Sequence, residues 1–158
     1  MKFFSDTVQI VIFYKEIKQQ SVLYLLLKRS ESDDVYPGIW QVCTGTSFSE
    51  ETSLETALRE VEEETGINSF LNLWTVPKVA SYFSIRRNAI CFSPIFAIEI
   101  EPSTQIKLSE EHSEFIWVNA EQAKQMLVIP SHKESIDYVE DYIINVETSN
   151  LFKIKKSK

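Results

Sequence analysis

The chain has 158 residues, 44% of them hydrophobic, and a formal net charge of −7. This length and apolar content favour one domain with a substantial core, and the acidic balance argues against duplex nucleic acid as a partner, because phosphate backbones attract basic surfaces. The N-terminal apolar run is too short to span a bilayer and lacks a small-residue cleavage site, so we expect a cytoplasmic protein with no membrane partner.

The first half of the chain predicts a β-hairpin followed by a loop and a short strand. Residues 7–14 and 22–27 are rich in β-branched and aromatic side chains, and the polar stretch between them is typical of a turn. Ser, Asp, Pro and Gly in residues 30–38 indicate a loop, and residues 40–44 then predict a short strand. Cys43 and Cys91 lie in separate apolar segments, so no disulfide framework is indicated.

The second half predicts two strands and then helices. Residues 73–84 and 89–100 have strand composition, and the polar connection 101–114 leads into a short strand at 115–118. Asn119 is a good N-cap for a helix over 120–127, and an amphipathic pattern predicts a last helix from about residue 131 to 146. The basic end, residues 151–158, is expected to be flexible. This order of elements predicts one domain, residues 1–158, of mixed α and β structure.

The strongest local signals lie in residues 45–67, which read GTSFSEETSLETALREVEEETGI. Thr52 and Glu55 have the spacing of a capping box, so a helix is expected to begin near Ser53. Gly66 follows the last turn, where a left-handed residue ends a helix at low cost. The apolar stripe of this helix consists of Leu54, Ala57, Leu58 and Val61.

Three glutamates share a second face of this helix. Glu60, Glu63 and Glu64 are spaced i, i+3, i+4, and their repulsion costs roughly 0.2–0.5 kcal/mol per pair on an exposed helix. A divalent cation would offset that repulsion, because carboxylate oxygens are the ligands that Mg²⁺ and Mn²⁺ prefer. Arg59 beside them can hold a carboxylate by a bidentate pair. A solvated acidic helix face is the alternative interpretation.

With Gly45 and Glu51 added, the segment resembles the Nudix box, G-x5-E-x7-R-E-U-x-E-E-x-G-U, in which U is aliphatic. Every specified position matches. Two neighbouring residues depart from the common pattern, because many family members have Gly where this chain has Thr44 and Glu50. If the second of these positions required a positive φ, Glu50 would carry a penalty of about 1–2 kcal/mol.

The resemblance implies a fold and a metal site. The Nudix fold is an α/β class fold with a mixed β-sheet sandwiched between α-helices, and Nudix enzymes hydrolyse nucleoside diphosphates linked to another group with Mg²⁺ or Mn²⁺. By position, the metal ligands would be Glu60, Glu64 and Glu63, with the carbonyl of Gly45. Glu63 would also orient or activate water, and Glu51 and Arg59 would support the catalytic arrangement. A purely structural ion pair between Glu51 and Arg59 is the alternative.

A further carboxylate ligand often comes from outside the box in this family. We favour Glu111, in the polar connection before the strand at 115–118, as both metal ligand and catalytic residue. Glu110 and Glu114 are alternatives, and surface glutamates without a role would look the same in the sequence.

Residues on both sides of the box resemble one branch of the family. They are Ile39-Trp40-Gln41-x-x-Thr44-Gly45 before the box, and Glu111-His112 before Trp117. This is the branch of the bacterial dihydroneopterin triphosphate diphosphatases, also known as dATP pyrophosphohydrolases. It implies an Mg²⁺-dependent enzyme that releases pyrophosphate from a nucleotide or pterin triphosphate. Arg29 would then contact the phosphates, and Thr44 and His112 would line the site, unless Arg29 is a surface cation and His112 a loop histidine without a role.

Aromatic residues and other branches leave further alternatives. Trp40 suits the core better than a base-stacking role, and Tyr82 and Phe83 fit either strand packing or stacking on a base or pterin. Tyr82 also lies near the place of a tyrosine in diadenosine polyphosphate hydrolases, although their usual Pro-Lys-Gly before the box is absent. ADP-ribose hydrolases tend to have a proline there, and Pro77 comes too early.

A module that binds nucleotides without cutting them is the remaining class. Such modules usually lose box carboxylates, and this chain keeps them all. The sequence is also compatible with a homodimer.

Overall fold

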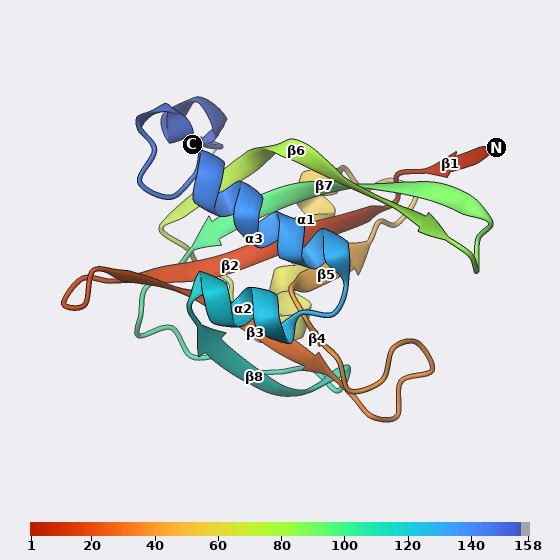
Figure 1. Ribbon diagram of the computed structural model, residues 1–158, viewed down its shortest axis with the longest axis horizontal. Coiled ribbons are helices and arrows are strands. Elements are labelled where there is room, and N and C mark those ends of the chain that lie inside the picture. Colours follow the sequence, from red (N-terminus) through yellow and green to blue (C-terminus); the bar gives the residue numbers. More distant parts are fainter. Residues whose placement is uncertain (156–158) are drawn as a thin grey trace.

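The computed structural model describes residues 1–155, and within them eight strands form one mixed sheet (Figure 1). The strands are β1 (Lys2–Phe4), β2 (Thr7–Glu16), β3 (Ser21–Arg29), β4 (Trp40–Gln41), β5 (Cys43–Thr46), β6 (Asn72–Ser84), β7 (Ala89–Glu99) and β8 (His112–Val118). The helices are α1 (Ser53–Thr65), α2 (Ala120–Met126), α3 (Pro130–Tyr142) and the 3₁₀ helix η1 (Glu147–Phe152). Within the described residues, no helix is long and apolar enough to cross a membrane.

Strand β2 is the centre of the sheet, and its neighbours make the sheet mixed. It pairs in parallel with β7, where Gln9 lies opposite Ile95, and antiparallel with β3 and β5. Strand β8 extends the sheet beyond β3, and β6 pairs antiparallel with β7. Because β5 lies against the start of β2, Gly45 stands opposite Val8, and a short loop, residues 47–52, then leads into α1.

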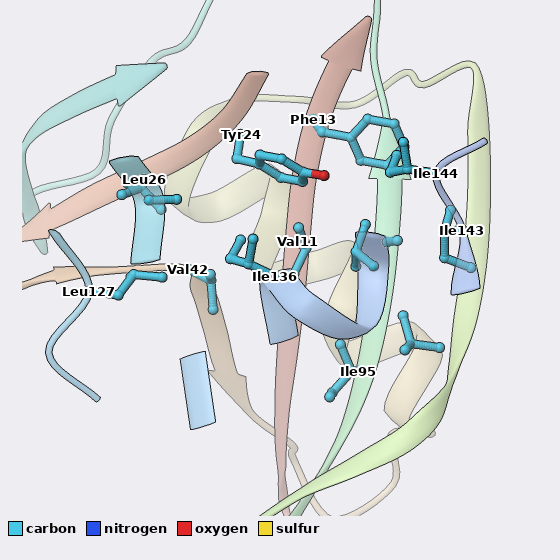
Figure 2. Close-up of a cluster of buried hydrophobic side chains, with 14 of the residues drawn as sticks. Val11, Phe13, Tyr24, Leu26, Val42, Ile95, Leu127, Ile136, Ile143 and Ile144 are labelled. Carbon is cyan, nitrogen blue, oxygen red and sulfur yellow. The ribbon is translucent and has the colours of Figure 1, made fainter. Parts of the chain in front are cut away.

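Helices cover both faces of this sheet. Alternate residues of β2 point to opposite faces, so Val8 and Ile10 pack in one core cluster with Val61 of α1. Val11 packs in the other cluster with Ile136 of α3, and Figure 2 shows this second cluster in detail. In Figure 1, α2 and α3 lie in front of the sheet and α1 lies behind it. The predicted α/β/α sandwich is therefore confirmed.

Helix α1 begins and ends as its local sequence predicts. The side chain of Thr52 accepts a hydrogen bond from the backbone N–H of Glu55, whose carboxylate accepts one from the backbone of Thr52. Such a cap stabilises a helix by about 1 kcal/mol. Gly66 has φ 72° and closes the helix in the left-handed conformation. Glu50 is not among the residues with positive φ, so the penalty considered for it does not arise.

Two strands differ from the sequence-based expectation. The strand predicted at 40–44 is divided, because β4 pairs with β3 whereas β5 pairs with β2. The polar connection predicted to run to residue 114 ends sooner, because β8 already begins at His112. Residues 112–114 pair through their backbone with the end of β3, and the side chains of Ser113 and Glu114 face solvent, so their composition does not resemble that of a strand.

The C-terminal part also differs. The helix predicted to reach residue 146 ends at Tyr142, and Asn145 then adopts a positive φ that no helix tolerates. The flexible end predicted from residue 151 stays a prediction; in the structure η1 extends to Phe152, and the backbone N–H of Ile154 donates to the carbonyl of Leu73 over 2.8 Å. Residues 156–158 lie outside the described residues.

Candidate active site

A cavity of about 860 Å³ opens where α1, β5, the end of β3 and the start of α3 meet. Its volume is within the usual range for small-molecule sites. The predicted site residues in its wall are Arg29, Thr44, Gly45, Arg59, Glu60, Glu63, Glu64 and Glu111. Glu51 and His112 are not part of this wall, and their contacts are described below.

Glu60 lies directly against Gly45. A Cβ atom on Gly45 would be 2.0 Å from Cγ of Glu60 and 2.5 Å from its Cδ, far inside normal contact distance. Gly45 has no positive φ, so this close approach, rather than backbone conformation, requires glycine here. Burial raises the pKa of the Glu60 carboxyl, although the hydrogen bond from Arg59 lowers it in part.

Glu64 is the most deeply buried acid of the site, with 4% of its surface exposed. Burial raises the pKa of its carboxyl to about 8, and the nearby charges of Glu60 and Glu111 act in the same direction. Its donors are neutral: the thiol of Cys43, 3.1 Å from Oε2, and the backbone N–H of Thr44. Glu64 therefore holds a proton near pH 7 in this structure, and a cation bound beside it would favour the charged carboxylate.

Arg59 organises the remaining acids. Its Nε and Nη2 atoms bond both carboxylate oxygens of Glu51 over 2.6 and 2.9 Å, which lowers the pKa of Glu51 to about 2. Its Nη1 atom donates to Glu60 over 2.8 Å and to Glu63 over 3.0 Å. The guanidinium also lies 4.2 Å from the centre of the Phe48 ring. The bidentate pair with Glu51 thus fixes the orientation of the Arg59 guanidinium, which also contacts two glutamates that line the cavity.

The donor set suits a hard divalent cation, although its atoms are not gathered around one point. Within residues 1–155, no three His, Cys, Asp or Glu side chains are close enough to hold a metal ion as they stand. Arg59 accounts for this arrangement, because its Nη1 atom holds the carboxylates of Glu60 and Glu63 against the guanidinium by hydrogen bonds. These side chains all carry oxygen atoms, which are the ligand atoms that Mg²⁺ prefers.

Among the three acidic candidates outside the box, Glu111 lies nearest the carboxylates. It lines the cavity, and its charge raises the pKa values of both Glu64 and Cys43. Glu114 is instead paired with Lys28 over 3.2 Å on the surface, and Glu110 is exposed outside the wall. Glu111 is thus the candidate that lines the cavity, and its role as a metal ligand stays a prediction.

The three predicted substrate contacts lie in different surroundings. Thr44 and Arg29 line the cavity, and the Arg29 guanidinium is oriented by an ion pair with Asp33 and by the carbonyl of Val35. His112 lies behind the wall, 5% exposed, with its Nε2 atom 2.9 Å from Nε2 of Gln41. Gln41 lines the cavity and His112 does not, so the structure gives no direct contact between His112 and the space that a substrate would occupy.

Of the aromatic residues considered from the sequence, one lies outside the cavity wall and two line it. Trp40 packs against the core cluster on the α3 face and is not part of the cavity wall, which agrees with its interpretation as a core residue. Tyr82 and Phe83 both line the cavity, and their side chains are 39% and 56% exposed. Their strand therefore brings two aromatic side chains to the site.

Sequence reasoning missed several residues at the start of α3. Ser131 and His132 line the cavity together with Gln9 of β2. The Nε2 atom of Gln9 donates to Oγ of Ser131 over 3.1 Å, across more than a hundred residues of sequence. The only signal available was two polar residues after Pro130 and one polar residue inside an apolar strand, and neither predicts that they meet.

A family model described as NUDIX domain matches residues 5–139. The chain therefore belongs to the Nudix domain family, a family of hydrolases that generally use divalent metal ions. The resemblance inferred from the box is confirmed.

Similarity to individual proteins is more distant. A dihydroneopterin triphosphate diphosphatase from Haemophilus influenzae is 27% identical over 153 residues, which are 90% of this chain and 89% of that protein. The nucleoside triphosphatase NudI of Escherichia coli is 28% identical over 109 residues, 65% of this chain and 77% of that protein. An octanoyltransferase from Myxococcus xanthus is 27% identical over 105 residues, 63% of this chain, and the match spans only 28% of that protein.

Among solved structures, a protein from Listeria monocytogenes described as a NUDIX hydrolase superposes with a TM-score of 0.74. It is 26% identical, and the match covers 96% of this chain and all of that one. The fold predicted from the box resemblance thus agrees with an independent structure over nearly the whole chain.

Proposed function

We propose that this protein is a cytoplasmic, Mg²⁺-dependent pyrophosphohydrolase that cleaves a nucleoside triphosphate or a pterin-like triphosphate to the monophosphate and pyrophosphate. The observation that supports it most directly is the cavity wall, which Glu60, Glu64 and Glu111 line together. The two arginines in that wall, Arg59 and Arg29, are each already paired with an acid. A polyphosphate is itself an anion, so these carboxylates suit it only with a divalent cation between them. Cleavage of triphosphates by the Haemophilus influenzae and Escherichia coli relatives favours the same substrate class.

The cation would be held by Glu60, Glu64 and Glu111, with the Gly45 carbonyl and Glu63 nearby. When bound, Mg²⁺ withdraws negative charge from the phosphoryl oxygens as the anhydride bond breaks. Mn²⁺ prefers the same ligands and is the alternative metal.

The protein's own groups would position water and substrate. Glu63 is 57% exposed at its side chain and lies at the cavity, where it would accept a proton from the attacking water. Arg59 keeps Glu63 in place, and Glu51 keeps Arg59 in place. Arg29, oriented by Asp33, would bind the phosphate oxygens that the cation does not reach.

Identification of the products tests this proposal. The protein is incubated with Mg²⁺ and, in turn, the dNTPs, dihydroneopterin triphosphate, diadenosine tetraphosphate and ADP-ribose, and the products are separated by chromatography. Monophosphate plus pyrophosphate from one triphosphate is the expected result. The reaction should stop in EDTA and in the variant Glu64→Gln, whose fold is checked by circular dichroism. Turnover of ADP-ribose or diadenosine tetraphosphate alone would reject the triphosphate assignment.

Hydrolysis of a diadenosine polyphosphate is the second candidate. The observation that favours it is Tyr82, which lines the cavity and could stack on a second base. The same panel of substrates separates the two. A module that binds nucleotides without cutting them would bind ligand and release no product from any member of the panel.

A further inference from the structure

The cavity has a neutral polar wall on the α3 face of the sheet. Gln9, Ser131 and His132 all line it and are between 3% and 5% exposed. Gln9 donates to Ser131 and accepts a hydrogen bond from the hydroxyl of Ser135 at the back of the wall. Burial lowers the pKa of His132 to about 4, and the charge of Arg29 acts in the same direction, so the imidazole is neutral near pH 7. This wall contrasts with the charged groups contributed by α1.

Hydrogen-bonding capacity in this wall is incompletely used. The Nδ1 atom of His132 is buried and has no hydrogen-bond partner within the described part of the chain. Gln9 uses one N–H of its amide on Ser131, and a side-chain amide has two. Buried polar groups are normally satisfied, because an unpaired one loses the hydrogen bonds that water would give it. His132 and Gln9 both border the cavity, so these two side chains are the candidates in this wall for hydrogen bonds to a bound molecule.

An aromatic side chain lies on the same face of the sheet. Ala80 of β6 belongs to the core cluster beneath α3. Residues two apart in a strand point to the same side, so Tyr82 also points to the α3 face. Its ring is 39% exposed and lines the cavity. A flat ligand that bonds to His132 and Gln9 could therefore stack against Tyr82, a contact that favours aromatic rings.

We propose that His132 and Gln9 bind the hydrogen-bonding edge of a neutral heterocycle, with Tyr82 against its face, and that these three residues decide which triphosphate is accepted. The proposal rests on the proposed function for the position of the phosphates. The ligand class is a base or pterin whose edge has a donor beside an acceptor, because a side-chain amide can both donate and accept, and a neutral imidazole nitrogen donates or accepts according to its tautomer. The carboxylates and Arg29 would then bind the triphosphate and contribute little to selectivity.

Equilibrium binding separates recognition of the heterocycle from recognition of the phosphates. Titration calorimetry in Mg²⁺ is made with the Glu64→Gln variant, which should not consume its ligand. The probes are the four dNTPs, dihydroneopterin triphosphate and inorganic tripolyphosphate, which has no heterocycle. His132→Leu, His132→Asn and Tyr82→Leu are added in turn. Lys133→Ala, on the same helical turn but outside the cavity wall, is the control.

His132→Leu should weaken the affinity for the triphosphate that binds most tightly by tenfold or more, which corresponds to about 1.4 kcal/mol. It should leave tripolyphosphate binding unchanged. His132→Asn should recover part of the loss, because its amide can bond the same edge. Tyr82→Leu should weaken all heterocyclic ligands, and Lys133→Ala none.

Two results would overturn the proposal: unchanged heterocycle binding in His132→Leu, or an equal loss for tripolyphosphate. The wild-type product assay is independent of this experiment. If no triphosphate is cleaved but His132→Leu still selectively weakens heterocycle binding, the hydrolase assignment fails and the heterocycle site stands.

Discussion

Replacing Gly45 with Ala should disable the site and leave the fold in place. The new Cβ would lie 2.0 Å from Cγ of Glu60, whereas unstrained carbon atoms stay about 3.5–4.0 Å apart. Glu60 must therefore withdraw by roughly 1.5–2 Å. A misplacement of about 1 Å can cost about a hundredfold in rate, so we expect kcat to fall at least about a hundredfold. The cost in stability should be near the low end of about 1–3 kcal/mol for overpacking, because a long side chain can move aside.

Gly66→Ala is the matched control for this experiment. Gly66 lies at the end of the same helix with φ 72°, and an added Cβ would meet the side chain of Lys107 at 3.1 Å without touching a carboxylate. A left-handed Ala costs about 1–2 kcal/mol, similar to the cost expected for Gly45→Ala. Urea unfolding gives the two stabilities, and steady-state kinetics with the preferred triphosphate gives the two kcat values. Near-normal kcat in Gly45→Ala, or an equal fall in Gly66→Ala, would refute the crowding argument.

Three further predictions follow from the site. In EDTA, the free energy of unfolding should contain a component that decreases as pH rises from about 4.5 to 8, because Glu64 keeps its proton in the folded state over that range and the unfolded chain does not. Urea titrations at several pH values should show this component absent from Glu64→Gln; identical pH profiles would exclude it. Glu111→Ala should lower kcat far more than Glu114→Ala, since Glu114 is already paired with Lys28 on the surface; the reverse order in steady-state assays would move the extra ligand. Arg29→Ala should raise KM for triphosphates severalfold with little change in kcat, and an unchanged KM would make Arg29 structural.

Local signals allowed α1 and its carboxylates to be predicted from the sequence. A capping box, an apolar stripe and a terminal glycine all act within a few residues of one another, so each can be recognised without knowledge of the rest of the fold. The box resemblance implied that Glu60 and the Gly45 carbonyl serve the same metal site. Their direct contact, which leaves no room for a Cβ on residue 45, appears only in the structure.

Contacts between distant segments could not be predicted in this way. Gln9 and Ser131 meet because β2 runs beneath α3, and nothing near either residue indicates the other. His112 looked like a loop residue beside a favoured ligand, but its strand pairing with Arg29 turns it into the interior. The C-terminal segment was judged by its basic composition, which gives no sign that the backbone N–H of Ile154 donates to the carbonyl of Leu73.

The parallel pairing of β2 with β7 bears on how the chain folds. Gln9 and Ile95 are neighbours in the sheet but lie on opposite sides of the whole box segment in the sequence. Closing such a long loop is entropically costly, so sheets of this kind tend to fold slowly. The β2–β3 hairpin and the docking of α1 on β5 need only nearby residues. The acidic face can therefore assemble before the wall that carries His132, which must wait until the C-terminal half has been synthesised and has docked.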